Sequence, residues 1–534
     1  MSEDRHDDHR SEAADAEAVR PELAELRERL SATTDAGRPG AVAKRRKTGQ
    51  RTARENIADL VDEGSFAEYG ALALAAQRQR HPIDELVRLS PADGIVCGIG
   101  TVNRALFDDE RARTMVLAYD YTVFAGTQGA VGHKKLDRML ALAATWRVPI
   151  VLFAEGGGGR PNDIDMPTVA GLDTPSFLSF AALSGLVPRV GIASGRCFAG
   201  NAALLGCCDV IIATDDSTIG MAGPVMIEGG GLGTFKPEEV GPIAVQSKNG
   251  VVDVRVCDEA EAVAVTKKYL AYFQGSIAAW SCGDQAALRS ALPDQRRRAY
   301  KIRSIIETLA DVGSVLELRR DFGRSIVTAL VRIEGHPFGL VANDPVHLGG
   351  AVDADAADKA TRFFQLCDAF GLPIVSLCDT PGFMVGPQAE TTALVRHVSR
   401  MFVTAASLSV PFFTVVLRKG YGLGAQAMSG GHFHAPFFTI AWPTGEFGGM
   451  NLEGAVRLTM RKELEAIEDP AARAQTLQAM VAVAYERGKA INMASLLEID
   501  AVIDPAETRA WILRGLRSVP APARGGKRRV VDTW

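Results

Sequence analysis

The stretch 148–151 reads Val-Pro-Ile-Val, and the stretch 372–375 reads Leu-Pro-Ile-Val, at an offset of 224. The triplet Leu186-Val-Pro recurs as Ser409-Val-Pro at an offset of 223. The run 209–213 (Asp-Val-Ile-Ile-Ala) resembles 437–441 (Phe-Phe-Thr-Ile-Ala) at an offset of 228. Any single match can arise by chance between apolar segments. Three matches in unchanged order predict two copies of one α/β unit.

Apolar runs that alternate with Ala- and Leu-rich stretches indicate the fold class. We expect strands over 94–101, 114–120, 149–154, 190–193 and 210–214, and helices over 134–144, 177–185 and 199–205. Continuous apolar strands separated by helices are typical of a sheet that is buried on both faces. The sequence therefore predicts an α/β protein.

Three regions are expected along the chain. Residues 1–40 form a solvated tail and a short amphipathic helix, with Leu23, Leu26 and Leu30 on its apolar side and its end near 37–40. Residues 41–292 form the first α/β domain and residues 293–534 the second. The join is expected in the polar stretch 293–300.

Composition and charge exclude several classes of protein. The 534 residues carry 59 Lys and Arg against 64 Asp and Glu, a net charge of −5, which argues against nucleic acid as the main partner. Eight scattered cysteines without a Cys-x-x-Cys pair fit neither a disulfide framework nor a zinc site. The charged N-terminus lacks the apolar core of a secretory signal, and the apolar run 401–417, which contains Pro411, is too short to span a membrane. We therefore expect a cytoplasmic location and no membrane partner.

Two glycine-rich turns follow predicted strands, one in each copy. The first reads Glu155-Gly-Gly-Gly-Gly-Arg160, and the second reads Tyr421-Gly-Leu-Gly-Ala-Gln426. Without Cβ atoms, neighbouring backbone N–H groups can converge on one oxygen and polarise a carbonyl. The alternative is that these glycines serve only tight packing. Neither turn has the spacing of a P-loop or of a dinucleotide fingerprint.

Charged and metal-binding residue types give weaker signals. Glu155 and Asp379 follow predicted strands, where a carboxylate acts as a general base or caps a turn. His432 and His434 lack a third ligand, so we expect no metal. The basic stretch 44–47, with Arg51 and Arg54 on a helix expected to run to residue 60, is either a solvated face or a clamp for an anionic ligand.

Motifs spread over residues 48–514 resemble the carboxyltransferase (β) subunits of biotin-dependent acyl-CoA carboxylases, of the propionyl-CoA, methylcrotonyl-CoA and long-chain type. The segments that carry the resemblance are 49–57 (GQRTARENI), 120–124 (DYTVF), 367–370 (CDAF), 379–383 (DTPGF), 418–422 (RKGYG), 441–444 (AWPT) and 502–509 (VIDPAETR). The resemblance implies two tandem crotonase-like (ClpP/crotonase) domains, in agreement with the duplication.

The resemblance also implies an activity and partners. CO₂ would move from carboxybiotin to the α-carbon of an acyl-CoA, with the first domain binding CoA and the second binding biotin. The biotin would sit on a separate carrier protein, so a biotin carboxylase and carrier subunit are expected partners. The active site would form between protomers of a hexamer built as three dimers, without a metal in this subunit.

By position, the resemblance assigns roles to individual residues. The amides of Gly157 and Gly158 would hold the acyl-CoA carbonyl, and the turn Gly422, Leu423 and Gly424 would hold the biotin oxygen. Substrate contacts are expected from Gln426, Arg160 and Gly223, and contacts to CoA phosphates from Lys134, Lys135, Arg51 and Arg54. Biotin contacts are expected from Tyr421, Phe383 and Gly449.

This sequence departs from the family pattern at Leu423, Gln426 and the stretch 445–450. The position of Gln426 helps select short acyl chains in the family, so the acyl group stays open. Two alternatives also stay open. One is a biotin-independent acyl-CoA hydratase, isomerase or decarboxylase with Glu155 or Glu446 as base; the other is a non-catalytic scaffolding subunit of a carboxylase complex.

Overall fold

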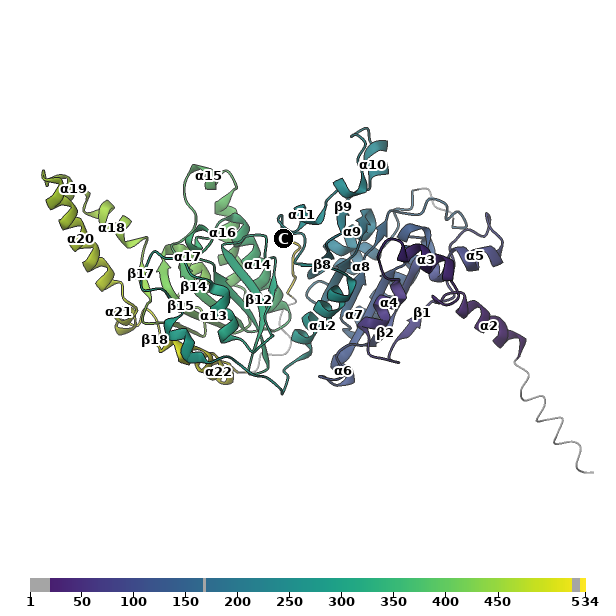
Figure 1. The fold of residues 1–534 in the computed structure, drawn as a ribbon, viewed down its shortest axis with the longest axis horizontal. Helices are drawn as coiled ribbons and strands as arrows, with labels where there is room; N and C mark the ends of the chain where they lie inside the picture. Colours follow the sequence, from purple (N-terminus) through teal and green to yellow (C-terminus); the bar gives the residue numbers. More distant parts are fainter. Residues whose placement is uncertain (1–19, 167–169, 521–528) are drawn as a thin grey trace, which may run out of the picture.

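The computed structural model describes residues 20–166, 170–520 and 529–534, and these form two α/β halves (Figure 1). The first half is built on a sheet of order β1-β2-β3-β4-β6-β8-β10, in which β2 is antiparallel to its neighbours and the strands from β3 onward are parallel. These strands are β1 (Ala67–Tyr69), β2 (Ile95–Thr101), β3 (Arg113–Tyr119), β4 (Ile150–Phe153), β6 (Arg189–Ala193), β8 (Val210–Thr214) and β10 (Val254–Val256).

The second half repeats this order in the sheet β11-β12-β13-β14-β15-β16-β18, again with its second strand antiparallel to both neighbours. The strands are β11 (Leu316–Leu318), β12 (Ile326–Ile333), β13 (His336–Asn343), β14 (Ile374–Thr380), β15 (Phe412–Tyr421), β16 (Phe438–Ala441) and β18 (Ala501–Val502), with β17 (Glu446–Gly448) beside β15. A small sheet in the first half joins β5 (Gly156–Gly157), β7 (Arg196–Phe198) and β9 (Thr218–Gly220).

Helices cover the sheets and extend from both ends of the molecule (Figure 1). Those of the first half are α2 (Pro21–Ser31), α3 (Pro39–Arg46), α4 (Ala53–Leu60), α5 (Ile83–Leu89), α6 (Asp109–Ala112), α7 (Ala130–Trp146), α8 (Ser176–Ala181), α9 (Ala199–Gly206), α10 (Pro224–Gly229), α11 (Ile243–Gln246) and α12 (Glu259–Gln274). Those of the second half are α13 (Ile302–Leu309), α14 (Ala354–Ala369), α15 (Pro387–Glu390), α16 (Leu394–Ala405), α17 (Gly422–Met428), α18 (Leu452–Thr459), α19 (Arg461–Glu465), α20 (Pro470–Arg487), α21 (Ala490–Ser495) and α22 (Thr508–Ser518).

Strand register confirms the duplication predicted from sequence. Met115 pairs with Ile150 between β3 and β4, and Gly339 pairs with Ile374 between β13 and β14, so both partners show the offset of 224. The next strand is shifted by 223, from Arg189 to Phe412, and the one after by 228, from Val210 to Phe438. These are the offsets of the three sequence matches. The five strands predicted in the first half are also confirmed, with ends that differ by at most one residue.

The predicted single helix through the basic stretch is wrong. The chain forms α3 and α4 instead, separated by Gly49 at a φ of +77°. Thr52 starts α4 with a capping box, in which its hydroxyl accepts from the Glu55 N–H and the Glu55 carboxylate accepts from the Thr52 N–H. The short N-terminal helix is confirmed as α2, which ends at Ser31, before the stretch 37–40. Its three leucines are about 40% exposed.

One hydrophobic core runs across the junction of the two halves. It contains Ile212 of β8 and Tyr269 of α12 together with Val341 of β13 and Phe364 of α14. Arg362 of α14 also donates to the carbonyl oxygen of Asp209 in the first half, at 2.8 Å. The boundary expected at residue 293 stays a prediction, although Leu288 already packs in the core of the second half.

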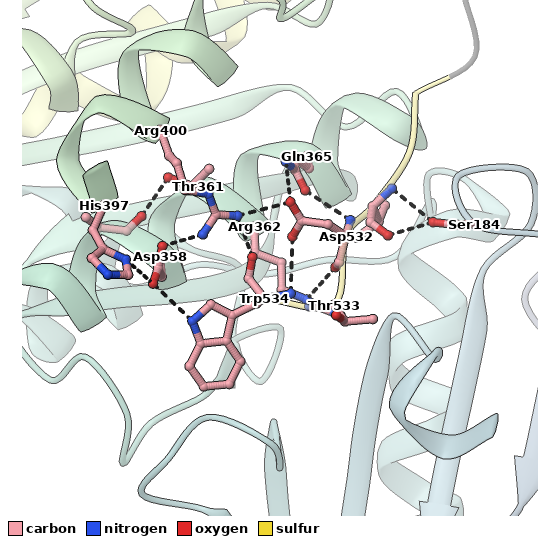
Figure 2. A network of polar contacts seen from close by, with 12 residues as sticks. Ser184, Asp358, Thr361, Arg362, Gln365, His397, Arg400, Asp532, Thr533 and Trp534 are labelled. Carbon is pink, nitrogen blue, oxygen red and sulfur yellow. Dashed lines mark hydrogen bonds and ion pairs between the residues drawn. The ribbon is translucent and has the colours of Figure 1, made fainter. Parts of the chain in front are cut away.

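The C-terminal segment 529–534 lies between the halves and bonds to both (Figures 1 and 2). Val531 exchanges two hydrogen bonds with the Ser184 hydroxyl of the first half, at 2.6 and 3.1 Å. Asp532 accepts from Arg400 of α16 at 3.0 Å, and the indole N–H of Trp534 donates to Asp358 of α14 at 3.0 Å. We call this segment the C-terminal clasp; it ties the first half to α14 and α16.

Each half also contains a buried lysine at the same position of its repeat. Lys135 of α7 donates to the carbonyl oxygens of Ala92 and Ile95. Lys359 of α14, at the same offset of 224, donates to those of Phe322 and Ile326 at 2.9 and 2.7 Å. Burial lowers the pKa of both lysines, that of Lys359 to about 7. In each half, the ammonium group thus attaches the start of the second strand, β2 or β12, to the first long helix, α7 or α14.

We expect the substitution Val531→Ala to lower the free energy of unfolding by about 1–3 kcal/mol, because Val531 is buried in the core shared by the halves. Urea denaturation gives the comparison. Val530→Ala is the matched control: Val530 is 58% exposed, and its loss should cost less than about 0.5 kcal/mol. Equal effects of the two substitutions would show that the C-terminal clasp is undocked in solution.

We expect Lys359→Met to remove a pH dependence of stability. The unfolded lysine has the ordinary pKa of 10.5 and the folded one about 7, so above pH 7 the unfolded chain binds more protons and stability rises with pH. Below pH 7 both states are protonated and this contribution is flat. The difference in unfolding free energy between the natural protein and Lys359→Met should therefore change by up to about 1.4 kcal/mol per pH unit between about pH 7 and 9. A constant difference across that range would contradict the proposed titration.

Candidate functional site

The first glycine tract makes a close backbone approach after β4. A Cβ on Gly157 would lie 1.8 Å from the carbonyl oxygen of Phe198, so this position accepts only glycine. Gly158, at a φ of +82°, has nothing within 4 Å of its would-be Cβ and therefore borders open space. The Gly158 carbonyl accepts from the N–H of Gln128 at 2.9 Å, which fixes the tract against the loop that leads into α7.

The second glycine tract forms the first turn of α17. Gly422 has a φ of +58°, and a Cβ there would lie 2.9 Å from the carbonyl oxygen of Gly449. A Cβ on Gly424 would lie 2.6 Å from the carbonyl carbon of Gly382, beside Phe383. Leu423 between them is 60% exposed. The structure thus brings together Gly422, Gly424, Gly449 and Phe383.

In each half, the loop after the central strand packs against the start of a later helix. The sequence did not reveal the start of α9, in the first half, as part of this arrangement. In the second half, Gly382 of the loop after β14 faces Gly424 of α17. In the first half, Gly157 faces Phe198, and Ala199 begins α9 with a φ of +51°, as Gly422 begins α17. The start of α9 is therefore a further candidate. No glycine run marks it in the sequence, but its offset of 223 from Gly422 does.

Two carboxylates expected as possible bases are held by arginines. Arg45 of α3 makes a bidentate pair with Glu155, at 2.6 and 2.5 Å. Burial raises the pKa of Glu155 to about 7, against the lowering effect of Arg45. Asp379 is fully buried and accepts from the Tyr300 hydroxyl at 2.8 Å and from Arg418 at 3.0 Å. Both carboxylates hold the loops that carry the glycines.

Glu446 of β17 is held in a different way, beside the second tract. Its carboxylate accepts from the hydroxyl of Tyr421, the residue before Gly422, at 2.8 Å. Burial raises the pKa of Glu446, while the Tyr421 hydroxyl lowers it. Tyr421 is almost fully buried, so its side chain anchors the start of α17.

The basic residues expected to bind phosphate are mostly paired within the protein. Arg51 bonds to Asp59 at 2.7 Å, and Arg54 makes a bidentate pair with Glu68 at 2.9 and 3.0 Å. The side chain of Arg160 is 4% exposed and bonds to Asp93 at 2.5 Å. Lys135 bonds to two carbonyls as described above, and Lys134 of the same helix is exposed. In this conformation Lys135 and Arg160 have structural contacts, and Lys134 is the cation of this set that solvent reaches most freely.

Gly223 lies near the first tract, with its would-be Cβ 3.4 Å from the Phe198 ring. In the second half, Gln426 lines an open cavity of about 930 Å³ together with Gly422 and Gly449. The structure therefore gathers the candidate glycines into two clusters, together with Gln426, Tyr421 and Phe383 in the second half. One surrounds Gly157 in the first half, and the other surrounds Gly422 in the second.

His432 and His434 line the same cavity as Gln426. Across the described ranges, no group of three or more His, Cys, Asp or Glu side chains is arranged to hold a metal ion.

Among the helices of those ranges, none combines the length and apolar character needed to cross a membrane.

Comparison with known proteins shows which family this chain resembles. The model of the carboxyl transferase domain family matches residues 44–522. The chain is 32% identical to the biotin-dependent long chain acyl-coenzyme A carboxylase beta4 subunit of Mycobacterium tuberculosis (strain ATCC 25618 / H37Rv), covering 92% of this chain and 93% of that protein. It is 31% identical to the methylmalonyl-CoA carboxyltransferase 12S subunit of Propionibacterium freudenreichii subsp. shermanii, with 93% of each chain covered.

Solved structures show the same similarity in three dimensions. A single-chain, multi-domain long-chain acyl-CoA carboxylase superposes with a TM-score of 0.88 at 58% identity. That match covers 93% of this chain but 49% of the carboxylase, so the chain spans about half the length of that protein. The transcarboxylase 12S hexamer, solved with methylmalonyl-coenzyme A bound, gives a TM-score of 0.82 at 28% identity, covering 96% of this chain and 99% of the other.

Proposed function

The chain belongs to the carboxyl transferase domain family, and we propose that it is the carboxyltransferase component of a biotin-dependent acyl-CoA carboxylase. Its fold is the tandem crotonase-like arrangement of α/β units. The observation that carries the proposal is the presence, at matching places in both halves, of a glycine loop packed against the start of a helix. One such place serves a thioester oxygen and the other a ureido oxygen.

In this proposal the first cluster binds the acyl-CoA. The backbone amides of Gly157 and Gly158 donate to the thioester oxygen and stabilise the negative charge that develops when the α-proton leaves. The open space beside Gly158 gives that oxygen room to approach. Gly223 and Phe198 flank the same place. Lys134, with Arg51 and Arg54 if their ion pairs exchange, would contact the phosphates of CoA.

The second cluster binds the ureido ring of biotin. Carboxybiotin, carried by a separate protein, supplies the carboxyl group and the basic nitrogen for the α-proton. Gly422, Leu423 and Gly424 present backbone N–H groups, and the close packing of Gly424 on Gly382 leaves the turn little freedom to move. Tyr421, Phe383 and Gly449 surround the turn. Glu446 acts here as a positioning residue through its hydrogen bond with the Tyr421 hydroxyl.

Two clusters in different halves imply an oligomer, since transfer requires their oxygens to meet in one cleft. We propose that the first cluster of one protomer faces the second cluster of its partner, in a hexamer like that of the 12S subunit. A separate biotin carboxylase and biotin carrier would complete the enzyme. The cytoplasmic location expected from the sequence stays a prediction.

The reverse reaction tests this function directly. The protein is incubated with free biotin and a panel of carboxylated acyl-CoAs, and formation of acyl-CoA is followed by chromatography. Transfer that requires biotin supports the proposal. Turnover of the thioester without biotin would instead support a hydratase, isomerase or decarboxylase, with which the arginine-bound Glu155 fits poorly as a free base.

We expect Gly158→Val to lower kcat of this transfer by about 10²–10³-fold, because the side chain enters the open space where the thioester oxygen is to bind. Gly64→Val is the matched control: Gly64 also has a positive φ, +69°, and nothing within 4 Å of its would-be Cβ, but it lies outside both clusters. The control carries the same backbone strain and should retain activity. Full activity of Gly158→Val in an assembled carboxylase would indicate a scaffolding subunit.

A further inference from the structure

The helix α16 lies between the C-terminal clasp and the second cluster. His397 and Arg400 of α16 are on the side of the clasp, where they meet the carboxylate of Asp358 from α14 (Figure 2). Phe402 of the same helix packs instead against Phe383, one of the residues around the second glycine turn, with ring centroids 6.2 Å apart. One helix therefore contacts the end of the chain and the proposed biotin site.

The buried carboxylate of Asp358 joins α16 to the clasp (Figure 2). The indole N–H of Trp534 donates to its Oδ2 atom at 3.0 Å, and the Nδ1 atom of His397 lies 2.6 Å from the same oxygen. Arg400 bonds to the other oxygen. Only 2% of the Asp358 side chain is exposed, so water cannot replace a donor that is removed. The position of α16 thus depends on the same carboxylate that binds the end of the chain.

Arg400 is held mainly by the clasp. Its guanidinium donates to the carboxylate of Asp532 at 3.0 Å and to the carbonyl oxygen of Trp534 at 2.5 Å, in addition to Asp358. Within the part of the chain that the structure describes, two of these three acceptors belong to the clasp. Without them the long arginine side chain would regain rotamer freedom, and α16 would lose its fixed contact on this side.

Phe402 packs beside two segments that fix α17. Its ring neighbour Phe383 has its backbone nitrogen 2.9 Å from the would-be Cβ of Gly424, in the first turn of α17. A Cβ on Gly431 would lie 3.6 Å from the Phe402 ring. The Gly431 N–H in turn donates to the carbonyl oxygen of Gln426, near the other end of α17, at 2.7 Å. A displacement of the Phe402 ring would therefore reach both ends of α17.

Arg400 and Phe402 are two residues apart on one helix, so they move together. A shift or rotation of α16 that follows the loss of the contacts of Arg400 also displaces the Phe402 ring. The amides of the second glycine turn have to keep their geometry to stabilise a negative oxygen, and an error of about 1 Å in such a site can cost about 10²-fold in rate. Contacts outside the site can thus control its activity.

We propose that Trp534 and Arg400 are positioning residues for biotin, which act through α16 and Phe402 to hold the Gly422 turn in the geometry that binds the ureido oxygen. The inference rests on the proposed carboxyltransferase function and adds to its second cluster a support that comes from the end of the chain. The first cluster, around Gly157, has no part in this path. The support should therefore affect biotin and leave the acyl-CoA unaffected.

The test uses Trp534→Ala and Arg400→Met in the full-length protein. In the biotin-dependent reverse transfer, each should lower kcat/KM for biotin by about tenfold. The Kd of the acyl-CoA, measured by calorimetry, should change by less than about twofold. The matched controls are Val530→Ala in the clasp and Val403→Ala on α16, whose side chains are 58% and 73% exposed, and both should retain full activity.

Two results of these measurements would overturn the inference. One is an unchanged kcat/KM for biotin in both variants. The other is an equal loss for biotin and for the acyl-CoA, which would show a general loosening of the protein rather than a support of one site.

A double-mutant cycle tests whether the effect passes through Phe402. Kinetics for biotin are compared in Trp534→Ala, in Phe402→Leu and in the protein that carries both substitutions. If Trp534 acts through Phe402, the double variant should lose about as much as the more impaired single variant, because the second change removes a contact that is already ineffective. A loss equal to the product of the two single losses would show independent effects and contradict the path.

Hydrogen exchange followed by mass spectrometry tests the support without requiring turnover. In Trp534→Ala, amides of residues 418–428 should exchange faster than in the natural protein, whereas those of residues 150–160 around the first glycine tract should not change. Equal acceleration of both segments, or none in 418–428, would overturn the inference. Faster exchange in 418–428 together with no biotin-dependent transfer by the natural protein would overturn the proposed function and leave the support of the turn standing.

Discussion

The geometry of both glycine clusters depends on a buried carboxylate at the carboxyl end of the central strand of each sheet. Glu155 follows β4, and Asp379 lies at the equivalent place near the end of β14; an arginine neutralises each of them. Removing one partner from such a pair typically costs about 3–5 kcal/mol, because the other charge stays buried. The carboxylates are also located where the chain leaves the sheet to form the glycine loops. Their ion pairs therefore determine where those loops begin.

Beside these two carboxylates, two backbone segments lie closer together than a Cβ atom between them would allow. A Cβ on Gly126 would lie 2.4 Å from the carbonyl oxygen of Glu155, and one on Gly350 would lie 2.4 Å from that of Asp379. The two halves thus use the same close contact at equivalent positions. The chemistry we propose needs main-chain amides held still, and rigid contacts of this kind provide that without a reactive side chain.

Much of the fold could be predicted from the sequence, because each buried strand is a short continuous run of apolar residues and the runs recur in the same order. The three repeat offsets match the strand register of both sheets. The break between α3 and α4 was missed although Thr52 and Glu55 carry a capping box, since the run of basic residues suggested one continuous helix. The family resemblance assigned ligand contacts to Lys135 and Arg160. Their partners, the carbonyl of Ala92 and the carboxylate of Asp93, come from a distant loop that sequence alone does not place.

The C-terminal clasp has a practical consequence for anyone who modifies the protein. Trp534 packs against Phe322 with ring centroids 5.5 Å apart, and its carbonyl oxygen accepts from Arg400 at 2.5 Å, so this residue is anchored to the second half although it is 42% exposed. An affinity peptide or fluorescent reporter fused directly behind Trp534 would start beside these contacts and would pull on the C-terminal clasp. α2 extends from the outer end of the first half, away from the C mark between the halves (Figure 1), so a fusion ahead of α2 leaves the joint untouched.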